Sequence, residues 1–164
     1  MSIQFGILTL SDRSSSGERA DESGPALAVL IRAQNWSVTK QAILPDDESA
    51  IRATLIEWAD SGEIDVILTT GGTGFAKRDI TPEATRAVIE RDAPGLAETM
   101  RAESLKKTPH AMLSRAVAGI RGHTLIVNLP GSPKGALENL QTILPVLPHA
   151  VQLLTDDPGS EASH

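Results

Sequence analysis

Two aspartates and a glycine-rich turn are the residues of this chain best suited to chemistry. Asp46 follows a proline after one apolar segment, and Asp79 lies shortly beyond the turn Gly71-Gly72-Thr73-Gly74. Three glycines in four positions allow positive φ angles and let the backbone approach a ligand closely. The amides of such a turn can form a nest for an anion, and Mg²⁺ commonly binds one or two carboxylates together with substrate phosphates. These residues predict metal-assisted chemistry on a phosphate.

Two further loops could complete an anion site. Ser11-Asp12-Arg13 opens a polar loop after the first apolar segment, and Pro130-Gly131-Ser132-Pro133-Lys134 follows the last one. Ser132 and the amides after Pro133 would lie at the amino end of a helix, where anions bind readily. Lys77 and Arg78 add positive charge near the glycine turn. Open α/β sheets bind ligands at the carboxyl ends of their strands, so we expect these loops to converge there.

Each candidate also has a simpler structural role open to it. Asp46 could cap the next helix, Ser132 could be a plain N-cap, and the glycine turn could join a strand to a helix with nothing bound. Arg13 and Lys77 could be ordinary surface charges. Asp79 precedes a Thr-Pro pair in which Thr81 is the predicted N-cap, so a functional role is favoured for Asp79.

The elements that must position these residues alternate between strands and helices. The apolar runs predict strands over Ile3–Leu10, Trp36–Leu44 and Val66–Leu68, and a hairpin of Ala116–Ile120 with Thr124–Leu129. Five helices are predicted. The first begins at Gly24-Pro25, the second follows Pro45 with Asp47 and Glu48 as first-turn acids, and the third begins at Pro82, after Thr81. The fourth covers Leu96–Lys106, and the fifth begins at Pro133 and is interrupted at Pro145 and Pro148. This order predicts an α/β fold with helices on both faces of a mixed, mostly parallel sheet.

Composition narrows the function further. The 164 residues, with 40% hydrophobic and 22% charged side chains, suit a single domain, which we place at 1–155 with a disordered tail at 156–164. A net charge of −6 and only 2% aromatic residues argue against a nucleic-acid binder. The chain has no cysteine, which excludes thiolate metal sites and cysteine nucleophiles. We see no signal-peptide pattern and no stretch of membrane-spanning length, and expect a cytoplasmic protein.

The usual nucleotide-binding motifs are missing. The chain has no Gly-Lys-Ser/Thr of a P-loop, and Gly72-Thr73-Gly74 is followed by Phe75-Ala76-Lys77, which lacks the third glycine of the dinucleotide fingerprint. A nicotinamide-dependent oxidoreductase is therefore disfavoured. The four histidines, His110, His123, His149 and His164, show no metal-ligand spacing.

Seven segments in order resemble the molybdopterin-binding MogA/MoaB family, and within it the molybdopterin adenylyltransferases. The chain is also similar to the matching domain of gephyrin. The likeness runs from about Ile3 to Leu154, and its first loop and Asp79–Pro82 look more like MogA than MoaB. The segments are Leu10–Arg13, Leu44–Asp47, Leu68–Phe75, Arg78–Thr85, Met112–Arg115, Gly119–Gly122 and Asn128–Gly135.

The resemblance implies a three-layer α/β/α sandwich that assembles as a homotrimer. It implies that molybdopterin reacts with MgATP to give adenylyl-molybdopterin and pyrophosphate, with Asp46 and Asp79 as the catalytic, metal-linked carboxylates. A non-catalytic molybdopterin-binding scaffold of the same family is the alternative. The sequence contains no second, metal-inserting domain, so we expect the product to pass to a molybdate-insertion enzyme. The substrate-binding residues implied are Ser11, Asp12, Arg13, Thr70, Gly71, Gly72, Thr73, Gly74, Asn128, Pro130, Gly131, Ser132, Pro133 and Lys134.

Overall fold

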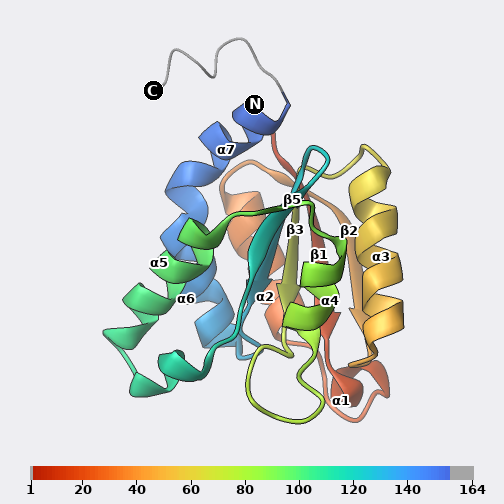
Figure 1. Ribbon diagram of the computed structural model, residues 1–164, viewed down its shortest axis with the longest axis vertical. Coiled ribbons are helices and arrows are strands. Elements are labelled where there is room, and N and C mark those ends of the chain that lie inside the picture. Colours follow the sequence, from red (N-terminus) through yellow and green to blue (C-terminus); the bar gives the residue numbers. More distant parts are fainter. Residues whose placement is uncertain (1, 156–164) are drawn as a thin grey trace.

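A mixed six-stranded sheet runs through the centre of the molecule (Figure 1). The computed structural model describes residues 2–155, so the tail predicted at 156–164 lies outside the described residues. The strand order is β2-β1-β3-β6-β5-β4. The strands are β1 (Gln4–Leu10), β2 (Ser37–Leu44), β3 (Val66–Thr70), β4 (Arg91–Asp92), β5 (Ala118–Arg121) and β6 (Thr124–Leu129).

Four of these strands are parallel and bring their carboxyl ends to one edge. β1 pairs with β2 and β3, and β3 pairs with β6, all in parallel. β3 and β6 are buried along their whole length, as their continuous apolar sequences predict. β5 pairs antiparallel with β6, which confirms the predicted hairpin and the mixed sheet. The two-residue strand β4, at the outer edge beside β5, was missed because 91–92 reads as a break in the sequence.

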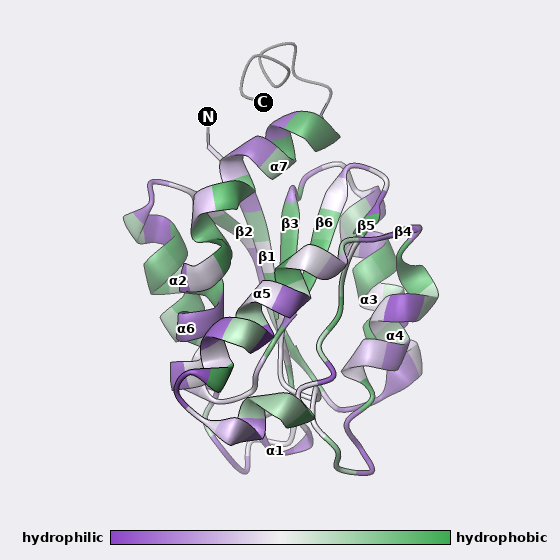
Figure 2. Ribbon diagram, turned by 60° about the vertical axis from the view of Figure 1, so that its left-hand side comes forward, coloured by the Kyte–Doolittle hydropathy of each residue, from purple (hydrophilic) through white to green (hydrophobic). Residues whose placement is uncertain are grey.

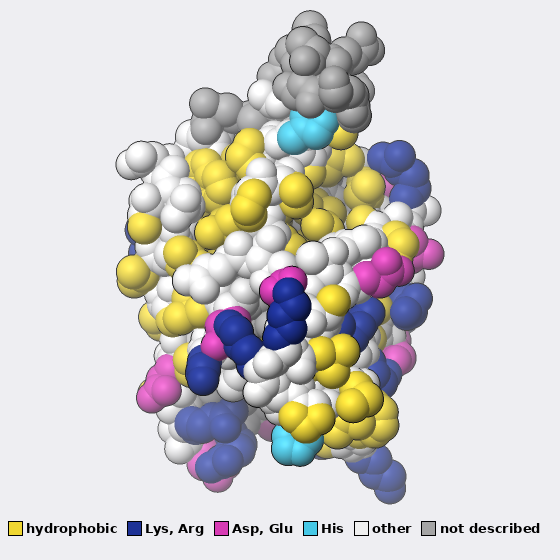
Figure 3. All heavy atoms as spheres, turned by 90° about the vertical axis from the view of Figure 1, so that its left-hand side faces the viewer, with side chains coloured by type: hydrophobic (Ala, Val, Ile, Leu, Met, Phe, Trp, Pro, Cys, Tyr) yellow, Lys and Arg dark blue, Asp and Glu magenta, His cyan; other side chains and the backbone are white. Residues whose placement is uncertain are grey.

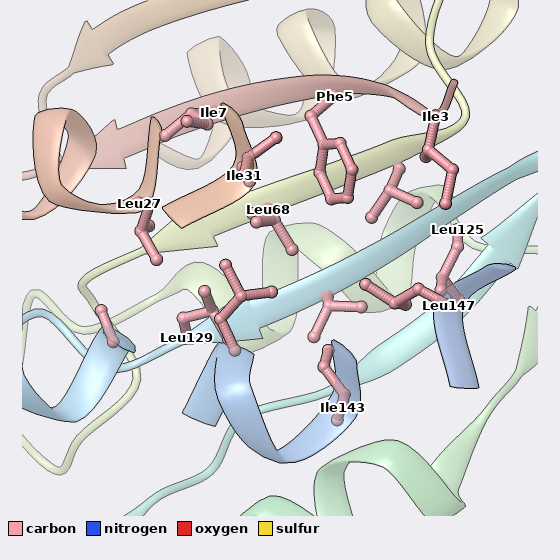
Figure 4. Close-up of a cluster of buried hydrophobic side chains, with 14 of the residues drawn as sticks. Ile3, Phe5, Ile7, Leu27, Ile31, Leu68, Leu125, Leu129, Ile143 and Leu147 are labelled. Carbon is pink, nitrogen blue, oxygen red and sulfur yellow. The ribbon is translucent and has the colours of Figure 1, made fainter. Parts of the chain in front are cut away.

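Helices cover both faces of the sheet and confirm the three-layer sandwich (Figure 2). One layer holds α2 (Ser23–Ala33), α5 (Pro94–Leu105), α6 (Pro133–Ile143) and α7 (Leu147–Leu154), and the other holds α3 (Glu48–Asp60) and α4 (Thr81–Val88). Successive side chains of β1 point to opposite faces of the sheet, so Ile7 packs in the core on one face and Leu8 in the core on the other. Figure 4 shows the first core, where Phe5 and Leu68 from the sheet lie among helix residues such as Ile31 and Ile143.

Two predicted helix starts were wrong, and both corrections concern the site. The carboxylate of Asp47 accepts the Ala50 amide at 3.1 Å and caps α3, so Asp47 is not a first-turn residue and Asp46 is not the cap. Thr81 is the first residue of α4 rather than its N-cap, which is Ile80. The Thr81 hydroxyl instead donates to the carbonyl of Gly71 at 2.9 Å. Asp46 therefore does not cap a helix, and the Thr81 side chain holds the glycine turn.

Other local predictions hold closely. Ser132 caps α6 by accepting the Gly135 amide at 3.1 Å. Pro145 and Pro148 split the last helix, because the 3-10 turn Leu144–Val146 separates α6 from α7. α5 begins and ends slightly earlier than predicted. The polar loop after β1 contains one short helix, α1 (Asp12–Ser15), which Ser11 caps.

Candidate functional site

A hollow of about 710 Å³ lies at the carboxyl edge of the sheet. This edge is the lower one in Figure 1, beside α1 and the loop between β3 and α4. The predicted convergence is confirmed for most of the candidate residues. Those that line the hollow are Ser11, Asp12, Arg13, Asp46, Thr70, Gly71, Gly72, Asp79, Gly131, Ser132 and Pro133.

The glycine turn lies tightly against its neighbours. Gly71 and Gly72 have φ angles of 106° and 69°, which favour glycine. A side chain on Gly71 would collide with the carbonyl oxygen of Leu10 at the end of β1. One on Gly72 would collide with the Thr81 hydroxyl and lie 3.2 Å from Oδ1 of Asp46. Because no side chain fits here, the backbone of the turn forms the wall beside the Asp46 carboxylate.

One carboxylate oxygen of Asp46 makes no hydrogen bond to the described residues. Its Oδ2 accepts the Asp12 amide at 3.2 Å, and its own amide donates to Oδ1 of Asp12 at 3.0 Å, so the two loops hold each other. Oδ1 of Asp46 is buried and has no hydrogen-bond partner among residues 2–155. Burial raises the pKa of Asp46, and the negative charges of Asp12 and Asp79 raise it further. A buried, unpartnered carboxylate oxygen beside two other acids is a suitable ligand for a cation.

Arg78 completes this part of the site. Its Nε and Nη2 atoms donate to the Asp12 carboxylate at 2.5 and 3.0 Å, and Nη2 also donates to the Asp46 carbonyl at 3.0 Å. The hydrogen bond from Arg78 lowers the pKa of Asp12, which is therefore an anion at neutral pH. The sequence indicated only a local cation at Arg78, because its partners lie far away in the chain.

Asp79 is the second acid proposed as a metal ligand, and it also lines the hollow. Its Oδ2 accepts the Ala76 amide at 2.9 Å, and its amide donates to the Ala76 carbonyl at 3.0 Å. A side chain on Gly74 would lie only 2.9 Å from the same Oδ2 atom. The Ala76 amide therefore helps to orient the Asp79 carboxylate, and Asp79 lines the same hollow as Asp46.

Arg19, Asp21 and Ser23, in the loop after β1 and at the start of α2, form a wall that sequence reasoning missed. Arg19 donates through Nη2 to the Ser11 hydroxyl at 3.2 Å, and Ser23 donates to the Gly131 carbonyl at 2.7 Å. Asp21 accepts the Thr9 hydroxyl at 2.8 Å. All three residues line the hollow. Their place after the first parallel strand was the available signal, because such loops lie at the ligand-binding edge.

Some predicted site residues lie outside the hollow. Thr73, Gly74, Pro130 and Lys134 are not among its lining residues. The side chain of Asn128 is buried in the interior, where Nδ2 donates to the hydroxyls of Thr69 and Thr85 at 3.0 and 2.9 Å. Its Oδ1 accepts the Val117 amide at 3.0 Å. Asn128 thus ties β6 to β3, α4 and the segment before β5, and its role as a substrate-binding residue stays a prediction.

The acids of the site fit a metal that shares its ligands with a substrate. Among the described residues, no group of three or more His, Cys, Asp or Glu side chains could hold an ion by itself. Asp46 and Asp79 alone would leave most positions of an octahedral Mg²⁺ open for phosphate oxygens and water. The unpartnered Oδ1 of Asp46 is the observation that supports this fit.

Comparisons with known proteins identify the family of this chain. Residues 6–149 match the family model described as a probable molybdopterin binding domain. The molybdopterin adenylyltransferase of Helicobacter pylori J99 is 44% identical over 93% of this chain and 88% of its own length. The molybdenum cofactor synthesis protein cinnamon of Drosophila melanogaster is 49% identical over 95% of this chain, which spans only 26% of cinnamon.

A solved structure shows the same architecture. The crystal structure of the molybdopterin biosynthesis enzyme MoaB from Thermus thermophilus superposes with a TM-score of 0.89 at 52% identity. The match covers 95% of this chain and 98% of the other. The family model covers most of the chain and the fold is shared with this relative, so the chain belongs to the MogA/MoaB family of molybdopterin-binding domains.

Proposed function

We propose that this protein is a molybdopterin adenylyltransferase that uses MgATP. In this reaction an oxygen of the molybdopterin phosphate attacks the α-phosphorus of ATP, the bond to the β-phosphate oxygen breaks, and pyrophosphate leaves. The observation that carries the proposal is the unpartnered Oδ1 of Asp46, buried beside Asp79 and the glycine turn. Relatives that cover most of the chain carry this enzyme name, which supports the same reading.

The chain's own residues would act mainly by positioning and by neutralising charge, as expected for transfer at phosphorus. Asp46 and Asp79 would hold Mg²⁺, which supplies positive charge against the phosphate oxygens when bound. Gly71 and Gly72 let a ligand approach the backbone. Ser132 and Pro133 begin an 11-residue helix whose amino end lies at the hollow and favours a phosphate there.

The alternative is a scaffold that binds molybdopterin without chemistry. A scaffold gains nothing from a buried carboxylate oxygen without a partner, because such a group lowers the stability of the free protein. The enzyme needs that oxygen for its metal. The state of Asp46 therefore favours the enzyme.

Pyrophosphate release decides between the two. The protein is mixed with molybdopterin, ATP and Mg²⁺, and released pyrophosphate and adenylyl-molybdopterin are measured together. We expect equal amounts of both, with neither formed when molybdopterin or Mg²⁺ is left out. Stoichiometric binding of molybdopterin without pyrophosphate would establish the scaffold instead.

We also propose a homotrimer that works in the cytoplasm and passes its product to a separate molybdate-inserting enzyme. Hydrophobic side chains gather on the face formed by α5, α6 and α7 (Figure 3). Val146, in the 3-10 turn before α7, and Leu153, in α7, are exposed hydrophobic residues. Such a patch suits contact between copies of the chain. Sedimentation should give a trimer, and a monomer at micromolar concentration would contradict the proposal. In the part of the chain described, no helix is long and apolar enough to cross a bilayer.

A further inference from the structure

Arg115 holds the loop that carries Asp79, although it lies outside the main hollow. Its Nε atom donates to the Gly74 carbonyl at 2.8 Å, and Nη2 donates to the Asp79 carbonyl at 2.7 Å. Its own amide donates to the Thr73 carbonyl at 2.8 Å. Gly74 and Asp79 are the two ends of the loop, so the guanidinium of Arg115 links the two ends through their carbonyl groups.

The tip of this loop is exposed, and a turn between Ala76 and Asp79 is its internal support. Residues 75–78 are exposed, and Phe75 has 69% of its surface in solvent. The contacts of Arg78 with Asp12 and Asp46 hold the tip on one side. On the other side, the Asp79 backbone is held by Arg115. If that contact is lost, the Asp79 peptide can rotate and move its carboxylate out of the hollow.

Arg115 is itself fixed from two helices. Glu83 on α4 accepts from Nη1 at 2.7 Å and from Nη2 at 3.3 Å, and this pairing with Arg115 lowers the pKa of Glu83. On α5, Arg101 donates through Nη1 to the carbonyls of Ser114 and Ala116 at 3.3 and 2.9 Å. The backbone on either side of Arg115 is thus tied to α5, and its side chain to α4.

We propose that Arg115, oriented by Glu83, is a positioning residue that sets the place of the Asp79 carboxylate. The inference rests on the proposed function, because it takes Asp79 to be a metal ligand. Catalytic groups must be held to within about 0.5 Å of their working geometry, which a loop achieves only with rigid support. A guanidinium can reach two carbonyls and a carboxylate at once from one plane, whereas a lysine ammonium cannot keep that geometry.

The chain offers a matched control at the opposite edge of the sheet. Arg121 donates through Nε and Nη2 to the Asp60 carboxylate at 3.0 and 3.1 Å, and through Nη1 to the Val88 carbonyl at 2.9 Å. Arg121 therefore makes the same kind of contact as Arg115, but away from the glycine turn. A purely structural role for Arg115 predicts that Arg115→Lys and Arg121→Lys behave alike.

The test compares Arg115→Lys, Glu83→Gln and Arg121→Lys with the wild-type protein. We measure kcat, the KM for molybdopterin, the Mg²⁺ concentration for half-maximal rate, and amide exchange over residues 74–79. We expect Arg115→Lys to lower kcat about 10- to 100-fold, the range typical of residues that orient metal ligands, and to raise the Mg²⁺ requirement about tenfold. The KM for molybdopterin should stay within about twofold, and Glu83→Gln should give a smaller change in the same direction.

Arg121→Lys should leave all four quantities near wild type, even if it lowers the melting temperature as much. Equal kcat and Mg²⁺ dependence in Arg115→Lys and Arg121→Lys would overturn the proposal. If the wild-type protein releases no pyrophosphate, the proposed function fails, and amide exchange still tests the loop. In that case an unchanged rate of amide exchange over residues 74–79 in Arg115→Lys would show that Arg115 does not hold this loop.

Discussion

The two edges of the sheet use similar polar groups in opposite ways. At the amino edge of β6, Arg121 is paired with Asp60 and with the Val88 carbonyl, and the Thr124 hydroxyl donates to the Ile64 carbonyl at 2.8 Å. At the carboxyl edge, Asp46 keeps a buried oxygen without a partner among the described residues. At the amino edge these polar groups are hydrogen-bonded to one another, whereas at the carboxyl edge a buried oxygen of Asp46 is left without a hydrogen bond from the described residues.

This difference separates stability from function. A group that is paired within the protein contributes to folding, and a buried group left unpaired costs stability unless a ligand completes it. Positive-φ glycines occur at both edges, at Gly122 in the hairpin and at Gly71 and Gly72 in the site. Only those in the site are crowded by neighbouring atoms. If the carboxyl edge is the functional one, substitutions there should lower activity more than matched substitutions at the amino edge.

The largest effect is expected from Asp79→Asn. Removal of a charge-stabilising group from a polar active site costs about 10²- to 10³-fold in kcat, and we expect a loss of this size in adenylyl-molybdopterin formation. The asparagine can still accept the Ala76 amide, so the free energy of unfolding should change by no more than about 0.5 kcal/mol. Steady-state kinetics and urea unfolding measure the two quantities. Near wild-type turnover would remove Asp79 from the mechanism.

Alanine at Gly72 and at Gly122 compares the two edges directly. Both positions have positive φ, of 69° and 57°, so both substitutions carry a backbone cost of about 1 kcal/mol. At Gly122 the added methyl would meet nothing within 4 Å. At Gly72 it would crowd Thr81 and Asp46, which adds about 1–3 kcal/mol. Chemical unfolding should show the larger loss for Gly72→Ala, and equal losses would show that the turn is not crowded.

Two substitutions of Ser132 distinguish its role as a helix cap from a role in phosphate binding. Asp and Asn both cap helices well, so Ser132→Asp and Ser132→Asn should keep the stability that Ser132 gives α6 to within about 0.5 kcal/mol. The aspartate also places a negative charge at the hollow. We expect Ser132→Asp to raise the KM for ATP or molybdopterin about tenfold relative to Ser132→Asn. If the two variants share one KM for each substrate, no phosphate lies near this helix end.

Asp46→Asn should stabilise the free protein slightly, even though it removes a proposed metal ligand. Burial raises the pKa of Asp46 above its usual 3.8, so its charged form destabilises the fold at neutral pH. The asparagine removes that charge, and we expect a melting temperature about 2 °C higher at pH 7. The gain should shrink as the pH falls through the raised pKa towards 3.8, because wild-type Asp46 is then protonated. A lower melting temperature for Asp46→Asn at pH 7 would contradict the raised pKa.

The general plan of the site could be predicted from the sequence because strand ends converge. An apolar run followed by Gly71-Gly72 had to be a buried strand with a tight turn, and parallel pairing then brought that turn to the loops of Asp46 and Ser132. The identity of the α3 cap could not be predicted, because Asp46 and Asp47 are adjacent and equally suited.

The hydrogen-bond partners of side chains such as Asn128 could not be predicted either, because they lie far away in the sequence. Asn128 lies beside the Pro130 loop in sequence, but its side chain points into the core, where it reaches Thr69 and Thr85. Arg78 and Arg115 find their partners on segments far away in the chain. Local sequence patterns contain no information about such pairs.

Metal binding with a bound nucleotide tests the central claim most directly. Mn²⁺ can replace Mg²⁺ as a spin probe, and electron paramagnetic resonance counts the ions bound in the presence of a non-hydrolysable ATP analogue. We predict tight binding to the wild-type protein and at least tenfold weaker binding to Asp46→Asn and Asp79→Asn, with Asp60→Asn at the opposite edge as an unaffected control. Equal Mn²⁺ affinity in all four proteins would contradict a metal held by Asp46 and Asp79.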